Sequence, residues 1–113
     1  MANIKFDGTT HEDVKISRYQ TVDFEFTPEI TLDQIECLYF TLKQGIVVIE
    51  KAVTAFVAGD TSVVIELSQT DTATLKSTSA CQCQIRYKSL NDKAYVTPIV
   101  EYKVSDVLKD VQI

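Results

Sequence analysis

The sequence predicts an all-β protein, an antiparallel sandwich of about seven strands with one short helical turn near residues 69–75. Apolar and polar residues alternate with period two along most of the chain, as on strands with one buried face. Turn signals recur about every 8–12 residues, the spacing of strands in sandwiches. A length of 113 residues suffices for one hydrophobic core, so we expect a single domain over residues 1–113.

The N-terminal segment, residues 1–20, contains the polar stretch DGTTHED. We expect it either to be mobile or to pair along a sheet edge. The first clear strand follows in DFEF, where alternation places Phe24 and Phe26 on one face. Acidic residues occupy the other face, so this strand is predicted to have one buried and one solvated side.

The stretch ECLYFTLKQGIVVIEKAV predicts two strands joined by a short turn. Leu38, Phe40 and Leu42 share one face of the first strand. The turn is placed at residues 43–45, because the glycine that ends it tolerates positive φ. The return strand carries apolar residues on both faces, and we expect both to be partly covered.

The stretch VAGDTSVVIEL repeats this scheme, with a turn at Gly59 and Asp60 before a β-branched run over residues 63–67. LSQTDTATLK then interrupts the alternation. Ser68 and Asp71 within it have the spacing of a capping box. A single helical turn is therefore predicted to cross between strands at this point.

The stretch CQCQIRYKSLNDKAYVTPIV predicts another hairpin, with its turn at residues 90–93, and EYKVSDVL predicts a closing strand. Because proline has no N–H to donate, Pro98 is expected at a strand start or a sheet edge. The inward positions of all strands define one predicted core. Its members are Leu38, Phe40, Leu42, Val64, Leu67 and one face of the strand over residues 81–87.

Two cysteines one residue apart, Cys81 and Cys83, could indicate metal binding, redox chemistry or burial. Alternation puts both on the face that also carries Tyr87, where cysteine behaves as a small buried hydrophobe. Along an extended strand their sulfurs lie roughly 6–7 Å apart, too far to share a tetrahedral zinc ion. Cys37 and the single histidine, His11, could at most complete a four-ligand site. The prediction is therefore buried, reduced cysteines without a metal.

The composition disfavours enzymes and nucleic-acid binders. A net charge of −5 opposes the counterion release that drives binding to phosphates. The sequence lacks a glycine-rich phosphate loop and a nucleophile elbow, so we expect neither catalytic residues nor a cofactor. No apolar run approaches the roughly 20 residues that span a bilayer. Because the N-terminus also lacks a signal-peptide pattern, we expect no membrane association and no Sec-type export.

Three stretches of the chain suggest a family. They are YFTLKQ with its hairpin partner VVIEK, then ELSQTDTATL, and then CQIRYKSLNDKAY before a closing strand. Their order resembles the immunoglobulin-like modules of tail and baseplate proteins of tailed bacteriophages and prophages, including the N-terminal module of upper baseplate proteins. The likeness extends over residues 20–110. The chain departs from such modules where KSTSACQ replaces a glycine that is common before the hairpin strand. We also expect no receptor-binding domain after it.

This resemblance implies a non-enzymatic structural protein, an assembly or adaptor module of a tail, baseplate or head. Such a protein would be made in the cytoplasm of the host bacterium and would reside in the virion. Its partners would be other virion proteins and further copies of itself. The terminal stretches NIKFDGTT and VLKDVQI could each extend a sheet of a neighbour. The candidate interface residues are Ile4, Phe6, Val111 and Ile113.

A carbohydrate-binding sandwich that recognises a bacterial surface is the alternative function. It is motivated by the five tyrosines and by the frequency with which sandwiches bind sugars. Tyr19, Tyr95 and Tyr102 are less clearly inward than the other two. A row of exposed aromatic rings in the structure would favour this alternative.

Overall fold

The computed structural model describes residues 2–8, 14–57 and 59–108, and within them the chain forms nine strands and two short helical segments. The strands are β1 (Ala2–Phe6), β2 (Lys15–Ser17), β3 (Val22–Phe26), β4 (Ile35–Gln44), β5 (Val47–Val53), β6 (Val63–Leu67), β7 (Cys81–Ser89), β8 (Ala94–Val96) and β9 (Val100–Ser105). The helical segments are the 3-10 turn η1 (Leu32–Gln34) and the helix α1 (Gln69–Ala73). The predicted all-β class and the predicted helical turn are confirmed.

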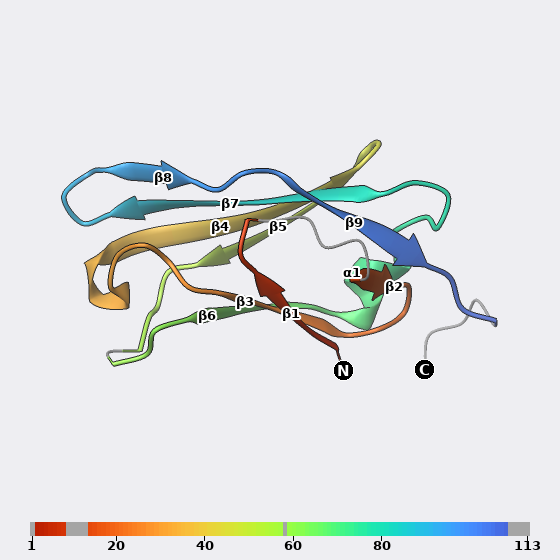
Figure 1. The fold of residues 1–113 in the computed structure, drawn as a ribbon, viewed down its shortest axis with the longest axis horizontal. Helices are drawn as coiled ribbons and strands as arrows, with labels where there is room; N and C mark the ends of the chain where they lie inside the picture. The colour runs from red at the N-terminus through yellow and green to blue at the C-terminus, as the bar shows by residue number, and fades with distance from the viewer. Residues whose placement is uncertain (1, 9–13, 58, 109–113) are drawn as a thin grey trace.

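The strands form two layers, which Figure 1 shows with the larger sheet above the smaller one. The small sheet has the order β1-β3-β6, and the larger sheet has the order β2-β9-β7-β4-β5, with β8 also paired to β7. In the larger sheet, the strand order β9-β7-β4-β5 matches the order G, F, C and C′ of an immunoglobulin sheet. In the small sheet, β3 and β6 occupy the positions of strands B and E. The structure is therefore an immunoglobulin-like sandwich.

Two features differ from the predicted antiparallel sandwich of about seven strands. The N-terminal segment contributes a strand to each layer, β1 to the small sheet and β2 to the larger one, and both pairings are parallel. In addition, two strands share one edge of β7: β9 pairs with its first part and β8 with its last part, and the chain between β8 and β9 interrupts the pairing. Pro98 lies in this interruption, where its missing N–H costs no ladder hydrogen bond, as the sequence predicted.

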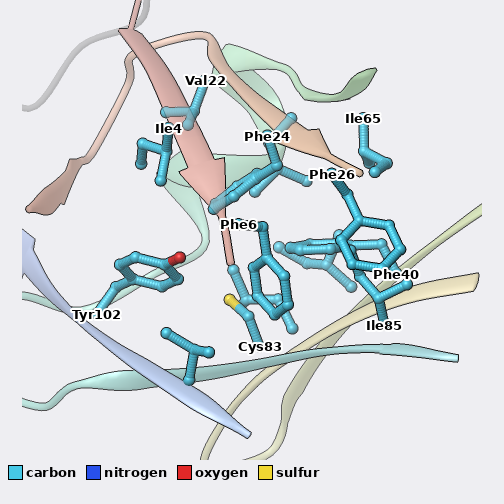
Figure 2. Close-up of a cluster of buried hydrophobic side chains, with 14 of the residues drawn as sticks. Ile4, Phe6, Val22, Phe24, Phe26, Phe40, Ile65, Cys83, Ile85 and Tyr102 are labelled. Atoms are coloured by element: carbon cyan, nitrogen blue, oxygen red, sulfur yellow. The ribbon is translucent and has the colours of Figure 1, made fainter. Parts of the chain in front are cut away.

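Aromatic side chains from both layers meet in the core (Figure 2). The ring of Phe24 on β3 lies 4.8 Å from the ring of Phe40 on β4, centroid to centroid. Phe6 on β1 packs edge-on against Phe40 at 6.3 Å, and Tyr102 on β9 lies 5.7 Å from Phe24. Burial confirms the inward positions that the sequence predicted for the following side chains: Phe24, Phe26, Leu38, Phe40, Leu42, Leu67, Cys81, Cys83, Ile85 and Tyr87.

The predicted core position of Val64 is wrong. Its side chain is 54% exposed on the outer face of the small sheet, whereas Val63 and Ile65 are buried. Residues of one strand that share a face are separated by an even number of positions, so Val64 and Leu67 must face opposite ways. The run VVIEL begins with consecutive apolar residues, which lie on opposite faces of the strand. Alternation therefore could not show which of these residues face the core.

The β4–β5 hairpin is fixed to the rest of the molecule by a buried glutamine. The turn consists of Gly45 and Ile46, with φ +58° at Gly45, and so begins two residues later than predicted. Gln44 therefore ends β4, and its amide Nε2 donates hydrogen bonds of 2.7 Å to the carbonyl oxygens of Lys76 and Ser79. Its Oε1 accepts a 2.6 Å bond from the Lys76 N–H. One side chain thus ties the hairpin to the segment after α1.

The helix α1 begins with the predicted capping box. The Asp71 N–H donates to the Ser68 hydroxyl at 3.2 Å, and the Ser68 N–H donates to the Asp71 carboxylate at 2.9 Å. Thr72, which is fully buried, donates its hydroxyl proton to the carbonyl oxygen of Gln20 at 2.9 Å. Lys51 on β5 reaches the same Asp71 carboxylate at 2.9 Å. The short helix is therefore anchored to both layers.

Arg18 joins the end of α1 to the end of β9. Its Nε–H donates to the carbonyl oxygen of Leu75 at 2.7 Å, and one Nη donates to that of Ala73 at 3.2 Å. The other Nη contacts the Asp106 carboxylate at 2.8 Å. The hydrogen bond from Arg18 holds the pKa of Asp106 below its ordinary value. A planar guanidinium can serve these three acceptors at once, whereas an ammonium group cannot reproduce that geometry.

Phe40→Ala should lower the free energy of unfolding by about 3–5 kcal/mol, because it removes a fully buried ring at the contact between the layers. Val64→Ala serves as the matched control and should change stability by less than about 0.5 kcal/mol, since Val64 is exposed. Urea denaturation measures both. A loss below about 1 kcal/mol for Phe40→Ala would show that this face of β4 does not carry the core.

Arg18→Met should cost about 2–3 kcal/mol in urea denaturation, because it retains the aliphatic stem but removes the charge-assisted hydrogen bonds. Arg18→Lys should restore only part of this loss. The pKa of Asp106 should rise toward its ordinary value in Arg18→Met, as measured by NMR titration. Because the folded-state pKa is lowered, this carboxylate contributes stability at neutral pH that is lost as the pH falls through that pKa. The pKa of Asp71, which burial raises and the bonds with Lys51 and Ser68 lower, is the internal control; equal shifts at both carboxyls would contradict the assignment.

Candidate functional site

The predicted placement of the paired cysteines is confirmed. Cys81 and Cys83 are both fully buried on the inner face of β7, opposite Tyr102 and Val100 of β9. The Cys81 thiol donates to the carbonyl oxygen of Tyr102 at 3.5 Å. Burial, together with the neighbouring thiol of Cys81, raises the pKa of Cys83 far above its ordinary value. Both side chains therefore belong to the hydrophobic core as thiols.

Cys37 does not approach the other two cysteines. It lies half-buried on the outer face of the larger sheet, where β4 pairs it with Lys88 of β7. Its side chain and the Cys81–Cys83 pair are therefore on opposite faces of one sheet. His11 lies outside the described residues. Within residues 2–8, 14–57 and 59–108, no cluster of three or more His, Cys, Asp or Glu side chains could hold a metal ion.

The predicted interface residues fall into two groups. Ile4 and Phe6 are 6% and 2% exposed, because β1 pairs with β3 of its own chain and turns these side chains into the core. An interface role for them would require β1 to leave its own sheet. Val111 and Ile113 lie outside the described residues, so their interface role stays a prediction.

A cleft of about 230 Å³ opens beside the two tyrosines of the β7–β8 hairpin. The rings of Tyr87 and Tyr95 stack with centroids 4.9 Å apart and planes 8° from parallel. The Tyr87 hydroxyl accepts a 3.1 Å hydrogen bond from the N–H of Glu29, and burial raises the pKa of that hydroxyl. Asp7 and Glu29 also line the cleft. The polar atoms of Tyr87 are thus used to fix the segment after β3.

Residues 2–8, 14–57 and 59–108 do not form the row of exposed rings that sugar binding would favour. In the described part of the chain every phenylalanine and tyrosine is buried or half-buried. Tyr19, one of the less clearly inward tyrosines, lies under the Arg18 guanidinium at 5.2 Å, and Tyr102 is buried in the core. Tyr39 lies on the outer face of the larger sheet, below Arg86 at 5.7 Å. These rings contact the chain's own side chains.

The two outer sheet faces are the broad surfaces that the residue patterns did not identify. The outer face of the larger sheet carries five cations, Lys15, Lys43, Arg86, Lys88 and Lys103, against the strand carboxylates of Glu36, Glu50 and Glu101. Asp92 of the adjoining turn adds a fourth carboxylate, which pairs with Lys88 at 2.9 Å. The outer face of the small sheet carries Asn3, Lys5, Asp23, Glu25, Val64 and Glu66. One face is therefore net basic and the other net acidic. Each strand alone shows only alternation, and this difference emerges only when the strand pairing is known.

Comparison with known proteins places the chain by its fold. No protein-family model matches it, and no curated protein matches it in sequence. Among solved structures, it is similar to the N-terminal domain of phage TP901-1 ORF48, with a TM-score of 0.53 and 11% sequence identity. The alignment covers 93% of this chain and 99% of that domain. No helix in the described residues is long and apolar enough to cross a membrane.

In native buffer, Cys81 and Cys83 should react with a thiol reagent at least about tenfold more slowly than the half-buried Cys37, because burial blocks access to both side chains and also raises the pKa of Cys83. All three should react together in denaturant. Cys37→Ser isolates the buried pair and provides the control. Stoichiometric zinc by elemental analysis, or rapid labelling of the pair in folded Cys37→Ser, would contradict the assignment.

Proposed function

We propose that this chain is a non-enzymatic structural protein of a bacteriophage or prophage, acting as an assembly or adaptor module of a tail, baseplate or head complex. One observation carries the proposal: the fold follows that of a phage domain over 93% of this chain and 99% of that domain. The resemblance of the YFTLKQ, ELSQTDTATL and CQIRYKSLNDKAY stretches to tail and baseplate modules supports the finer assignment.

The use of polar side chains supports a structural role. Arg18, Gln44 and Thr72 each donate to backbone carbonyl oxygens of distant segments, and Asp71 closes a helix cap. These groups hold the sandwich together, because they form hydrogen bonds with other groups of the same chain. The molecule is elongated, measuring 47 × 25 × 25 Å, so its largest surfaces run along its length. Such a module acts through surfaces that contact neighbours, and repetition by symmetry multiplies weak contacts.

The proposed partners are other virion proteins and further copies of this chain, and the proposed location is the virion. Strand edges offer one route to such contacts: β2 ends one side of the larger sheet and β6 one side of the small sheet. The C-terminal residues Val111 and Ile113 remain candidates for adding a strand to a neighbour. Ile4 and Phe6 would take part only by exchange of β1 between copies.

Particles purified from the bacterial strain that carries the gene should contain this protein. After induction and density-gradient purification, mass spectrometry should detect it in the particle fraction together with the major capsid protein. An abundant host cytoplasmic enzyme, depleted from the same fraction, is the control for carry-over. Full peptide coverage of the capsid protein without any peptide of this chain would overturn the proposal.

A further inference from the structure

The outer faces of the two sheets are opposite in charge although the whole chain is acidic. The net charge of the chain is −5, yet the outer face of the larger sheet has five cations against four carboxylates, three on its strands and that of Asp92 in the adjoining turn, which pairs with Lys88. On the small sheet, Asp23, Glu25 and Glu66 stand against the single cation Lys5. Because the faces lie on opposite sides of the sandwich (Figure 1), one molecule cannot bring them together, but two molecules can.

Several charged side chains on the two outer faces form no ion pair within the described part of the chain. Within residues 2–8, 14–57 and 59–108, no ion pair engages Asp23, Glu25 or Glu66. The same holds, in this part of the chain, for Lys43 and Lys103. Charged groups that lack an internal partner can pair with a neighbour without first breaking a contact.

Each face also has an exposed apolar feature, which on the small sheet lies on the edge strand β6. Val64, 54% exposed, lies directly beside Glu25 on the small sheet. The larger sheet has a shallow depression of about 70 Å³, lined by Thr41, Lys43, Gln82, Cys83, Gln84 and Ile99. Ile99 is 57% exposed there, and the buried Thr41 Oγ1 has no hydrogen-bond partner among the described residues. An apolar knob next to a carboxylate thus matches a depression with a lysine and an unused hydroxyl.

The geometry points to head-to-tail stacking of copies of this chain. The small-sheet face of one copy lies on the larger-sheet face of the next, with Val64 in the depression and Glu25 toward Lys43. A whole side of the molecule, 47 × 25 Å, projects about 1,200 Å², and a standard interface takes about 800 Å² from each partner. The three five-residue strands of the small sheet cover only part of that side, so the segments around them must also contribute to the contact. Because the contacting patches differ, the contact is heterologous and propagates into a ring or a filament.

This inference deepens the assembly role proposed above and rests on it for its biological use. The contact is electrostatic at its rim, so association should weaken as the salt concentration rises. Sedimentation velocity of the full chain over a range of protein concentrations should show reversible association at low ionic strength. A chain that remains monomeric at every concentration and salt condition would overturn the inference.

Charge reversal tests which faces meet. Lys43→Glu and Glu25→Lys should each weaken association at least about tenfold, because like charges then face each other. An equimolar mixture of the two variants should regain association, since the two reversed side chains are again opposite in sign where the copies meet. Lys93→Glu, in the β7–β8 turn, changes the charge equally but lies off both faces and is the matched control.

The mixture also excludes misfolding as the cause, because an unfolded variant could not restore association. If the single variants associate as well as Lys93→Glu, or if the mixture stays weak, the stacking contact is wrong. The outcome is separable from the proposed function. A monomeric protein found in purified particles would overturn the stacking alone, whereas stacking by a protein that is absent from particles would overturn the virion role alone.

Discussion

Packing of the three-stranded sheet against the larger sheet is the constraint on which the rest of this structure depends. An isolated two-stranded hairpin is marginal in water, and small sheets of short strands depend on burying a hydrophobic face. The five-residue strands β1, β3 and β6 gain that cover through rings that meet between the layers, above all Phe24 and Phe40 at 4.8 Å. The buried thiols of β7 fill the same interior.

Polar side chains at the periphery of the core hold the ends of strands in place around this packing. Gln44 fixes one hairpin, and Arg18 fixes the junction of α1 with β9. Lys51 has a further effect, because it projects from the inner side of the edge strand β5, opposite Phe40, and pairs with Asp71. An inward-pointing charge on an edge strand discourages another chain from adding to that edge. Contacts between flat faces are consistent with an edge protected in this way.

Much of the fold could be predicted because most strands have one apolar and one polar face. Phe24, Leu38 and Cys83 were placed correctly by alternation alone, and the cap at Ser68 by the spacing of two residues. Alternation failed at Val64, where apolar residues occupy both faces of the strand. The parallel pairing of β1 and β2 could not be read from the sequence, because it depends on which strand the N-terminal segment meets in space.

The candidate surfaces were harder to predict than the core for a related reason. Burial of Ile4 and Phe6 depends on a partner strand 20 residues away, so an apolar terminal stretch could equally indicate an interface. The opposite charges of the two faces arise from residues on eight strands and exist only when those strands are paired. Local patterns specify which side of a strand is buried. They do not specify which residues of neighbouring strands share the exposed face of the sheet.

Native-state hydrogen exchange of the strand amides tests the dependence of the small sheet on the larger one most directly. If interlayer packing holds both sheets, the slowest amides of β3 and of β4 should exchange with the same free energy, that of global unfolding. Their exchange free energies should then fall in parallel as urea is added. Exchange of the β3 amides at a markedly lower free energy than those of β4 would show that the small sheet opens by itself, and would contradict the central role of the interlayer core.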